Sequence, residues 1–330
     1  MAENRPRVAF VFPGQGSHSP GMGYELFKDS TAAQEVWRAV DASGKEPLTS
    51  RVFDGSAESL QSTDVQQPAI VAMSIAALAA FNEELGFEGS FVGSSYPINV
   101  IVFAGHSVGL ISAVVGSGCT PIGEAVSLVR DRGRYMAEAA RAKPGRMAAV
   151  LGLDVCAVEG LVESIRNKMP GSYLSVANVN SPHQVVVAGD LLAIDHVVEA
   201  GRAAGARRII PLDVMGAFHS IAMLPARDAM RVRLLGVGIE SPIAPVLSNV
   251  DATELTAPSE IRAELADHIV APVRWLDGVR KIETMGVKHV VEFGHGSVIT
   301  GMLRRTVKGV ELHNVFDVKS ARSVVSVLTS

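Results

Sequence analysis

A serine flanked by glycines is the side chain in this sequence best suited to nucleophilic chemistry. Residues 105–109 read Gly-His-Ser-Val-Gly, which matches the pattern G-x-S-x-G. The apolar run 99–104 precedes this pattern and a segment rich in small residues follows it, as expected where a buried strand turns sharply into a helix. The glycines leave room for that turn and for an exposed hydroxyl. We therefore predict that Ser107 is a nucleophile. The alternative is a capping serine at an ordinary strand-to-helix turn.

A serine hydroxyl needs a general base at neutral pH, and the chain contains nine histidines. His106 adjoins the nucleophile, so at a sharp turn its side chain should diverge from the hydroxyl. His219 lies in the segment 216–220, Gly-Ala-Phe-His-Ser, where we expect an inserted unit to end and the main domain to resume. Clefts form at such junctions. His219 is therefore the candidate base, and a solvated or capping histidine is the alternative.

The predicted helix 121–140 carries an arginine on its apolar face. Arg132 lies three residues after Val129 and four before Met136, and both of these mark that face. The two neighbouring arginines of the helix should point away from it. A buried guanidinium is costly unless a carboxylate or phosphate meets it. Arg132 is therefore predicted to bind either a buried acid of the protein or an acidic substrate.

The first apolar run, 8–12, leads into Gly14-Gln15-Gly16. A dinucleotide-binding loop would require a further glycine at position 19, which is Ser19. The loop could instead present backbone N–H groups beside Ser107, because parallel strands place their sites at their carboxyl ends. Such donors would form an oxyanion hole. We find no Walker A lysine pattern and no HExxH pair, so the sequence indicates no metal site.

The order of apolar segments predicts an α/β protein with two units. A buried helix is expected from Gln66 onward. Between residues 141 and 213 the pattern is β-α-β-β-α-β, which is typical of a ferredoxin-like unit. We therefore assign 1–140 and 214–330 to a large domain and 141–213 to an inserted subdomain. The large domain is expected to resume with three strands, near 245–248, 289–292 and 311–316.

Composition excludes several classes of function. The 330 residues are 48% hydrophobic and 19% charged, which suits a globular chain of about two domains. With 30 Lys and Arg against 34 Asp and Glu, and no basic run, nucleic acid is not an expected partner. Cys119 and Cys156 form no disulfide framework, and we expect both to be buried. The run 8–12 is too short for a signal peptide or a membrane span, so no membrane partner and a cytoplasmic location are expected.

Six short motifs together resemble one family, the malonyl-CoA:acyl carrier protein transacylases. This family includes the acyltransferase domains of fatty acid and polyketide synthases. The resemblance runs from about Val8 to about Arg305, in the family's order and spacing. The motifs are Phe-Pro-Gly-Gln-Gly-Ser at 12–17, Gln-Pro-Ala at 67–69, Gly-His-Ser-Val-Gly at 105–109, Arg-Gly at 132–133, Asn-Val-Asn-Ser-Pro at 178–182 and Gly-Ala-Phe-His-Ser at 216–220.

The resemblance implies a fold and a catalytic apparatus. The fold would be an α/β-hydrolase-like large domain with an inserted ferredoxin-like subdomain. Ser107 would be the acylated nucleophile and His219 its base. A backbone carbonyl, that of His268, would orient His219, and the N–H groups of Gln15 and Val108 would form the oxyanion hole.

The resemblance also implies a substrate and a partner. Arg132 would bind the malonyl carboxylate, Gln67 and Asn180 would shape the site, and Phe218 would favour malonyl over branched acyl groups. The reaction would be ping-pong transfer from malonyl-CoA to the phosphopantetheine thiol of an acyl carrier protein, through a malonyl-serine. Coenzyme A would be the product, and no cofactor would be bound permanently.

The sequence departs from the family pattern at three places. Leu110 stands where the family usually has Glu, and His295 stands where many members have Pro. The loop from 86 to 99 also looks longer than usual. These departures concern the local shape of the site and remove no catalytic residue.

Three other functions remain open on the sequence. An acyl hydrolase could use the same serine, although an uncharged acyl chain has no use for a buried Arg132. An esterase of the α/β-hydrolase type would need an acid between the serine and the histidine, for which Asp190 or Asp213 could serve. A non-catalytic module that docks carrier proteins is the third.

Overall fold

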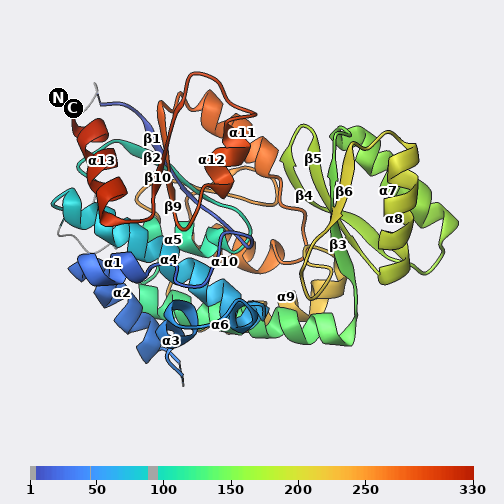
Figure 1. The fold of residues 1–330 in the computed structure, drawn as a ribbon, viewed down its shortest axis with the longest axis horizontal. Helices are drawn as coiled ribbons and strands as arrows, with labels where there is room; N and C mark the ends of the chain where they lie inside the picture. The colour runs from blue at the N-terminus through green and yellow to red at the C-terminus, as the bar shows by residue number, and fades with distance from the viewer. Residues whose placement is uncertain (1–4, 45, 88–95) are drawn as a thin grey trace.

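A six-stranded sheet organises the larger part of the protein, as the computed structural model shows for residues 5–44, 46–87 and 96–330 (Figure 1). Its strand order is β10-β9-β1-β2-β7-β8. The neighbouring strands are parallel except for β8, which pairs antiparallel with β7. The strands are β1 (Val8–Phe12), β2 (Val100–Gly105), β7 (Val246–Leu247), β8 (Glu254–Leu255), β9 (His289–Phe293) and β10 (Glu311–Val315). All strands predicted for this part of the chain are confirmed, and only β8 was not foreseen.

Helices cover both faces of this sheet because β1 is apolar on both sides. Phe10 and Phe12 face a core that includes α4 (Thr63–Glu84), α5 (Gly109–Gly116) and α13 (Val318–Thr329). Ala9 and Val11 face a second core, formed with α11 (Trp275–Thr284) and α12 (Val298–Leu303). A strand buried on both faces reads as a continuous apolar run, which is how β1 appears in the sequence.

Helix α4 is the central helix of the first core. It begins at Thr63, so Pro68 is its sixth residue and lies inside the helix, where proline has no N–H to donate to the carbonyl four residues earlier. Among the described residues it is the one helix long and apolar enough to cross a membrane, yet 94% of its most apolar window is buried within the protein. It therefore packs as a core helix.

The other helices pack around this framework. Trp37 and Phe53 make an edge-to-face contact that joins two of them. The remaining elements of the large part are α1 (Tyr24–Asp29), α2 (Thr31–Ala42), α3 (Leu48–Phe53), the 3-10 helices η1 (Glu58–Leu60) and η2 (Ile221–Met223), α6 (Ile122–Ala142), α9 (Leu224–Leu234) and α10 (Pro258–Asp267).

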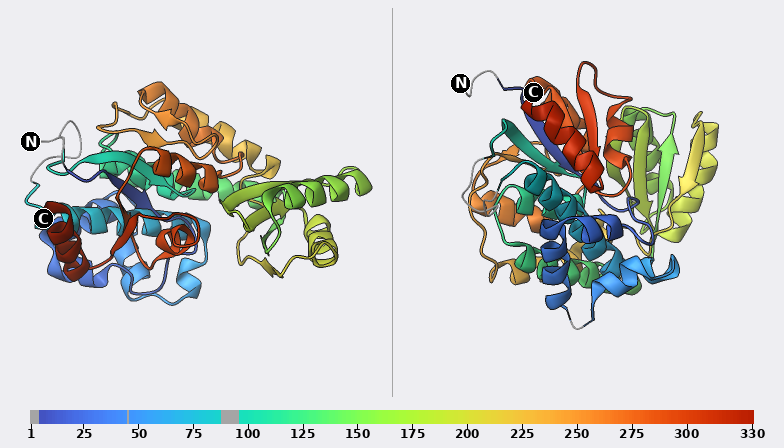
Figure 2. Two further views of the ribbon diagram at one scale, coloured as in Figure 1. Left: turned by 90° about the horizontal axis from the view of Figure 1, so that it is seen from above. Right: turned by 60° about the vertical axis from the view of Figure 1, so that its left-hand side comes forward.

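A four-stranded antiparallel sheet lies at one end of the molecule, in both directions of view (Figures 1 and 2). Its strand order is β4-β5-β3-β6, and it has a hydrophobic core of its own. The chain runs through β3 (Arg146–Leu151), α7 (Val155–Lys168), β4 (Leu174–Ser181), β5 (Gln184–Gly189), α8 (Leu191–Ala203) and β6 (Arg208–Pro211). The predicted β-α-β-β-α-β order of elements is thus present. Strand β4 is joined to the rest by two backbone hydrogen bonds with Val273, of 2.8 and 2.9 Å.

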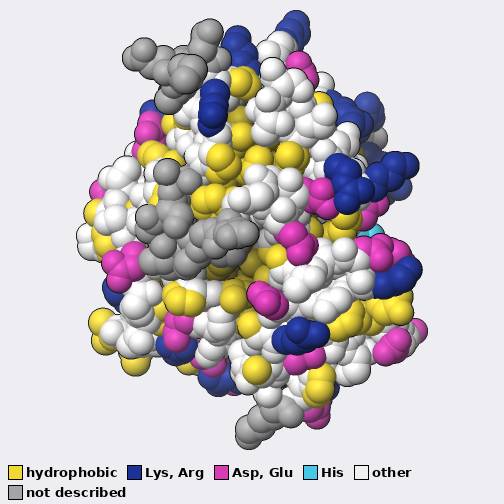
Figure 3. All heavy atoms as spheres, turned by 90° about the vertical axis from the view of Figure 1, so that its left-hand side faces the viewer, with side chains coloured by type: hydrophobic (Ala, Val, Ile, Leu, Met, Phe, Trp, Pro, Cys, Tyr) yellow, Lys and Arg dark blue, Asp and Glu magenta, His cyan; other side chains and the backbone are white. Residues whose placement is uncertain are grey.

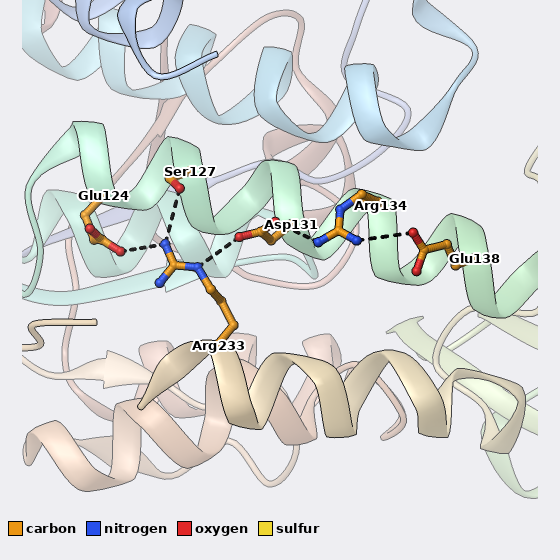
Figure 4. A network of polar contacts seen from close by, with 6 residues as sticks. All are labelled: Glu124, Ser127, Asp131, Arg134, Glu138 and Arg233. Carbon is orange, nitrogen blue, oxygen red and sulfur yellow. Dashed lines mark hydrogen bonds and ion pairs between the residues drawn. The ribbon is translucent and has the colours of Figure 1, made fainter. Parts of the chain in front are cut away.

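Helix α6 has one face toward solvent and one face inside. On the solvent side, Arg233 of α9 reaches across to Glu124, Ser127 and Asp131 of α6, at 2.8, 3.2 and 2.9 Å (Figure 4). Figure 4 also shows Arg134 between Asp131 and Glu138 of the same helix. On the opposite face Arg132 is fully buried, as the helical periodicity predicts.

The surface carries charges of both signs. On the face drawn in Figure 3, Lys and Arg side chains alternate with Asp and Glu side chains. Cys119 is buried as expected, but Cys156 is exposed, so that prediction was wrong. Cys156 occupies the second position of α7, where the first turn of the helix faces solvent.

Candidate active site

The polar residues of the candidate site gather where three neighbouring parallel strands end. Gln15 follows β1, Ser107 follows β2 and Asn249 follows β7, and these strands lie side by side in the sheet. Parallel strands place their carboxyl ends at one edge, which is where α/β proteins bind ligands. A cavity of about 720 Å³ lies at this edge. Its wall includes Ser107, His219 and Gln15 from the large part, and Met147, Asn178 and Leu212 from the four-stranded sheet or its end.

The turn at Ser107 is strained and needs its glycine neighbours. Ser107 has φ 53°, in the left-handed region that non-glycine residues seldom occupy. A Cβ on Gly105 would stand 2.0 Å from the carbonyl of Gly109, and a Cβ on Gly109 would stand 2.3 Å from the carbonyl oxygen of Phe12. Only glycine therefore fits at these two positions, and the turn projects the serine hydroxyl as the G-x-S-x-G pattern predicts.

Asn249 holds this turn in place, although it was not predicted. Its Oδ1 accepts a hydrogen bond from the backbone N–H of Ser107 at 2.8 Å, and its Nδ2 donates to the carbonyl of Gly105 at 2.8 Å. Asn249 is held in turn by the buried Glu264, which accepts from its backbone N–H at 2.6 Å and from Ser248 Oγ at 2.7 Å. A polar residue two positions after a buried strand was the available signal, but the sequence could not show that β7 lies next to β2.

The Ser107 hydroxyl and the His219 ring form a hydrogen-bonded pair. Ser107 Oγ lies 2.8 Å from Nε2 of His219. The other ring nitrogen, Nδ1, lies 2.8 Å from the carbonyl oxygen of His268 and 3.2 Å from that of Ala271. Carbonyl oxygens only accept hydrogen bonds, so Nδ1 carries the proton and Nε2 has a free lone pair for the serine proton.

The environment of His219 keeps its ring neutral. Burial and the nearby positive charge of Arg132 lower the pKa of His219 to about 3. An imidazole that is neutral at pH 7 can act as a general base.

The backbone carbonyls of His268 and Ala271 orient His219. They occupy the position at Nδ1 where an esterase of the α/β-hydrolase type would have a carboxylate. Asp190, one candidate for that acid, instead caps α8 and accepts from the backbone N–H groups of Ala193 and Tyr173, each at 2.9 Å. Asp213, the other, lies in the cavity wall. The His268 carbonyl takes the position that the family resemblance implied.

Arg132 is a buried cation surrounded by neutral groups. One guanidinium nitrogen donates to Gln67 Oε1, and another donates to Nε2 of His268 at 3.1 Å. Its Nε has no hydrogen-bond partner among the residues that the structure describes. Burial lowers the pKa of Arg132 to about 9, so it remains charged at neutral pH. In that described part of the chain no carboxylate neutralises it, so the structural ion pair considered above is not found.

The remaining predicted residues lie around these groups. The backbone N–H groups of Gln15 and Val108 have no hydrogen-bond partner within 5–44, 46–87 and 96–330. Phe218 lines the cavity beside His219. Asn180 accepts a hydrogen bond from Nε2 of His106 at 2.8 Å, so the His106 ring is bound on the side of Asn180 and not to Ser107.

Some predicted residues do not reach the cavity surface. The cavity wall formed by the described residues does not include Gln67, Val108, Arg132 or Asn180. Asn178 lines the cavity in place of Asn180. Gln67 nevertheless contacts Arg132 and, through Nε2, Thr63 Oγ1 at 2.9 Å. These residues therefore form a layer directly behind the wall.

The three departures from the family pattern lie in different parts of the structure. Leu110 is fully buried in the first core. His295 lies 2.9 Å, through Nε2, from Oγ of Ser19, at the end of β9. The loop 86–99 includes residues 88–95, which lie outside the described part of the chain.

Comparison with known proteins identifies close relatives. A family model described as an acyl transferase domain matches residues 9–327. The chain is 34% identical to a malonyl CoA-acyl carrier protein transacylase of Bacillus subtilis (strain 168), over 98% of this chain and 97% of the relative. It is 36% identical to the protein of the same description from Salmonella typhimurium, over 91% of this chain and 93% of the relative.

Solved structures agree with these relatives. An acyl-carrier-protein-S-malonyltransferase from Bartonella henselae superimposes with a TM-score of 0.91 and 33% identity, covering 98% of this chain and 99% of that one. A type II PKS acyl-carrier protein in complex with its malonyl-transacylase matches with a TM-score of 0.89 and 32% identity, covering 97% and 99%.

Proposed function

The chain belongs to the malonyl-CoA:acyl carrier protein transacylases, an acyl transferase family, and from this premise we propose that it moves a malonyl group from malonyl-CoA to the phosphopantetheine thiol of an acyl carrier protein. One observation carries the proposal. The Ser107–His219 pair, a nucleophile with its base, lies in the cavity wall, and Arg132 lies behind that wall, near enough to lower the pKa of His219 and with no carboxylate beside it among the described residues.

The first half-reaction uses the lone pair on Nε2 of His219. As the Ser107 hydroxyl attacks the thioester carbonyl, its proton passes to Nε2, and the carbonyl of His268 stabilises the imidazolium through Nδ1–H. We assign the oxyanion to the N–H groups of Gln15 and Val108, which have no hydrogen-bond partner among the residues that the structure describes. The carbon–sulfur bond then breaks, coenzyme A takes the proton from His219, and a malonyl-serine ester remains.

The second half-reaction runs the same steps in reverse. The phosphopantetheine thiol of the carrier protein gives its proton to His219 and attacks the ester carbonyl. The tetrahedral intermediate collapses, Ser107 recovers its proton, and the malonyl group leaves on the carrier. Water must be slower than the thiol in this step, which separates the transferase from an acyl hydrolase.

Arg132 accounts for the choice of an acyl group with a second carboxylate. The side-on pair of donors consists of Nε–H, which has no partner among the described residues, and an N–H of Nη2, whose present partner is the neutral His268; together they would hold a carboxylate in a bidentate pair. The anion would gain the charge-assisted contacts that the protein itself leaves unmade. An uncharged acyl group would leave the cation uncompensated.

The finer assignments belong to the same proposal. The fold is assigned as α/β-hydrolase-like for 1–140 and 214–330, with a ferredoxin-like subdomain at 141–213 that forms one wall of the cavity. Gln67, Asn180 and Phe218 are assigned to shaping the acyl site. We assign no permanently bound cofactor and a cytoplasmic location.

Intact mass spectrometry after mixing with malonyl-, methylmalonyl- and acetyl-CoA tests the function. The wild-type protein should gain a malonyl group, and Ser107→Ala should gain none. Ser112→Ala is the matched control, because Ser112 is a buried serine of the following helix outside the cavity wall. The adduct should disappear when a phosphopantetheinylated carrier protein is added and the carrier should gain its mass.

Each rival function has a distinct result in this experiment. An adduct that persists in Ser107→Ala would refute the nucleophile. Loss of the adduct to water at the same rate with and without carrier would identify a hydrolase. Absence of any adduct in the wild-type protein would favour a docking module.

A further inference from the structure

Two histidines and a glutamate meet at the edge of the large sheet opposite the catalytic serine. His289 begins β9, and Glu311 begins β10, which is the edge strand. The two strands are parallel, and their register places His289 directly beside Glu311. His313 follows Glu311 by two residues, so its side chain emerges on the same face of the sheet.

The three donor atoms form a compact triangle. His289 Nδ1 and His313 Nε2 are 3.1 Å apart, and Oε2 of Glu311 is 3.7 Å from the first and 3.9 Å from the second. A point in the plane of these atoms lies about 2.1 Å from each of them, which equals the usual distance from Zn²⁺ to imidazole nitrogen or carboxylate oxygen. The carboxylate is too far from either ring for a hydrogen bond, but it is at the spacing of a third ligand.

The burial of the three groups suits a metal site that remains open to water. The imidazoles are 12% and 15% exposed and are held by the sheet, whereas the Glu311 side chain is 69% exposed. Small movements of the carboxylate can therefore adjust the geometry toward a tetrahedron, with water as the fourth ligand.

We propose that His289, Glu311 and His313 form a Zn²⁺ site that fastens the edge strand β10 to β9. Two imidazoles and a carboxylate are a donor set that suits zinc among the common divalent ions. Both facing nitrogens must offer lone pairs to the metal. Without metal, one of these two nitrogens carries the proton of the hydrogen bond that joins the rings. When zinc binds, that ring takes the tautomer with its proton on the other nitrogen, which faces away from the metal. Two neutral rings therefore bind zinc without releasing a proton.

The site is separate from the acyl-transfer chemistry. Ser107 and Gln15 follow the carboxyl ends of their strands, whereas His289 and Glu311 stand at the amino ends of theirs. Roughly 13 Å of strand separates the two edges. Zinc here should therefore stabilise the fold without entering the reaction.

Isothermal titration of the full chain with zinc chloride, after removal of metal with EDTA, tests the site. The Cys156→Ser background removes the exposed thiol, which would bind zinc by itself. We expect one Zn²⁺ per chain and a melting temperature that rises with zinc concentration. His313→Ala and Glu311→Gln should each weaken binding about tenfold or more.

Matched variants separate this site from adventitious binding. His196→Ala removes an exposed histidine of α8 and should leave zinc affinity unchanged. Glu311→Gln changes an exposed side chain and should melt like the parent in EDTA, so a loss of zinc affinity there cannot come from misfolding. A lack of one-to-one binding in the parent, or equal affinity in parent and Glu311→Gln, would overturn the proposal.

Discussion

His268 links two buried side chains of the site, Arg132 and His219. Its Nε2 accepts a hydrogen bond from Arg132 at 3.1 Å, while its backbone carbonyl accepts from Nδ1 of His219 at 2.8 Å. Its Nδ1 donates to the carbonyl of Glu264 at 2.8 Å, which leaves Nε2 unprotonated and able to accept. The imidazole therefore positions Arg132 without neutralising it.

Replacing that imidazole with an acid should block malonyl transfer. In His268→Glu a carboxylate would pair with Arg132 and compete with the substrate, so malonyl acylation should fall steeply while acetyl acylation persists. His268→Gln keeps a neutral acceptor and should keep the malonyl preference. Single-turnover rates with both thioesters measure this. A malonyl rate in His268→Gln as low as in His268→Glu would mean that the neutral contact with Arg132 is not what matters.

Removing the cation should discriminate between substrates. Arg132→Ala loses a charge-assisted contact of about 1.5 to 3 kcal/mol for malonyl only, so its malonyl kcat/KM should fall roughly 10- to 150-fold. The acetyl rate should stay or rise. Arg134→Ala, an exposed arginine of the same helix, is the control. Equal losses for malonyl and acetyl groups would make Arg132 a structural residue.

Asn249 should matter for both rate and stability, because it bridges the strained turn at Ser107. In Asn249→Ala the N–H of Ser107 and the carbonyl of Gly105 both lose a buried partner, at a cost of about 1 to 3 kcal/mol for each unsatisfied group. The free energy of unfolding in urea should drop, and acylation of Ser107 should slow at least tenfold. Unchanged acylation would show that the glycines alone hold the turn.

Phe218 should exclude a branched acyl group, because its ring lies in the cavity wall beside the base. One methyl group in a pocket is worth about 1 to 3 kcal/mol, so malonyl-CoA should be preferred over methylmalonyl-CoA by roughly 10- to 200-fold in kcat/KM. Phe218→Ser should narrow that ratio in a competition between the two thioesters. Equal wild-type rates would place the ring away from the α-carbon.

Stability should fall as the pH drops below the ordinary histidine pKa of about 6.5. Burial lowers the pKa of His106, His219 and His268, so below that value the unfolded chain binds protons that the folded chain does not. The contribution of these neutral histidines to the free energy of unfolding is complete above the histidine pKa of the unfolded chain. It is lost progressively as the pH falls from there toward their lower pKa values in the folded protein. Burial raises the pKa of Glu264 and Glu292. These two carboxyl groups therefore make the folded protein more stable as the pH falls, but at lower pH, near the ordinary pKa of a glutamate.

Urea midpoints at several pH values between about 8 and 5 measure this effect. The midpoint should decrease continuously below about pH 6.5. His219→Ala should reduce the slope, because it removes one of the histidines whose pKa burial lowers. A flat midpoint over this range would contradict the low pKa values.

Local pattern was enough to predict several parts of the molecule. The strands β1 and β2 appear as apolar runs because both of their faces are buried. Helical periodicity placed Arg132 inside, and the G-x-S-x-G spacing located the turn at Ser107. Each of these features depends on the types and spacing of residues only a few positions apart, so a short segment of sequence is enough to predict it.

Other features depend on which strands are neighbours, and only the tertiary structure decided them. Asn249 reaches Ser107 because β7 pairs with β2, across 142 residues of chain. His289 meets Glu311 and His313 because β9 pairs with β10. The exposure of Cys156 likewise follows from how α7 packs on its sheet, and no periodicity reports it for a single small residue. Strand order arises from the burial of whole faces across the fold, and no short segment of sequence encodes it.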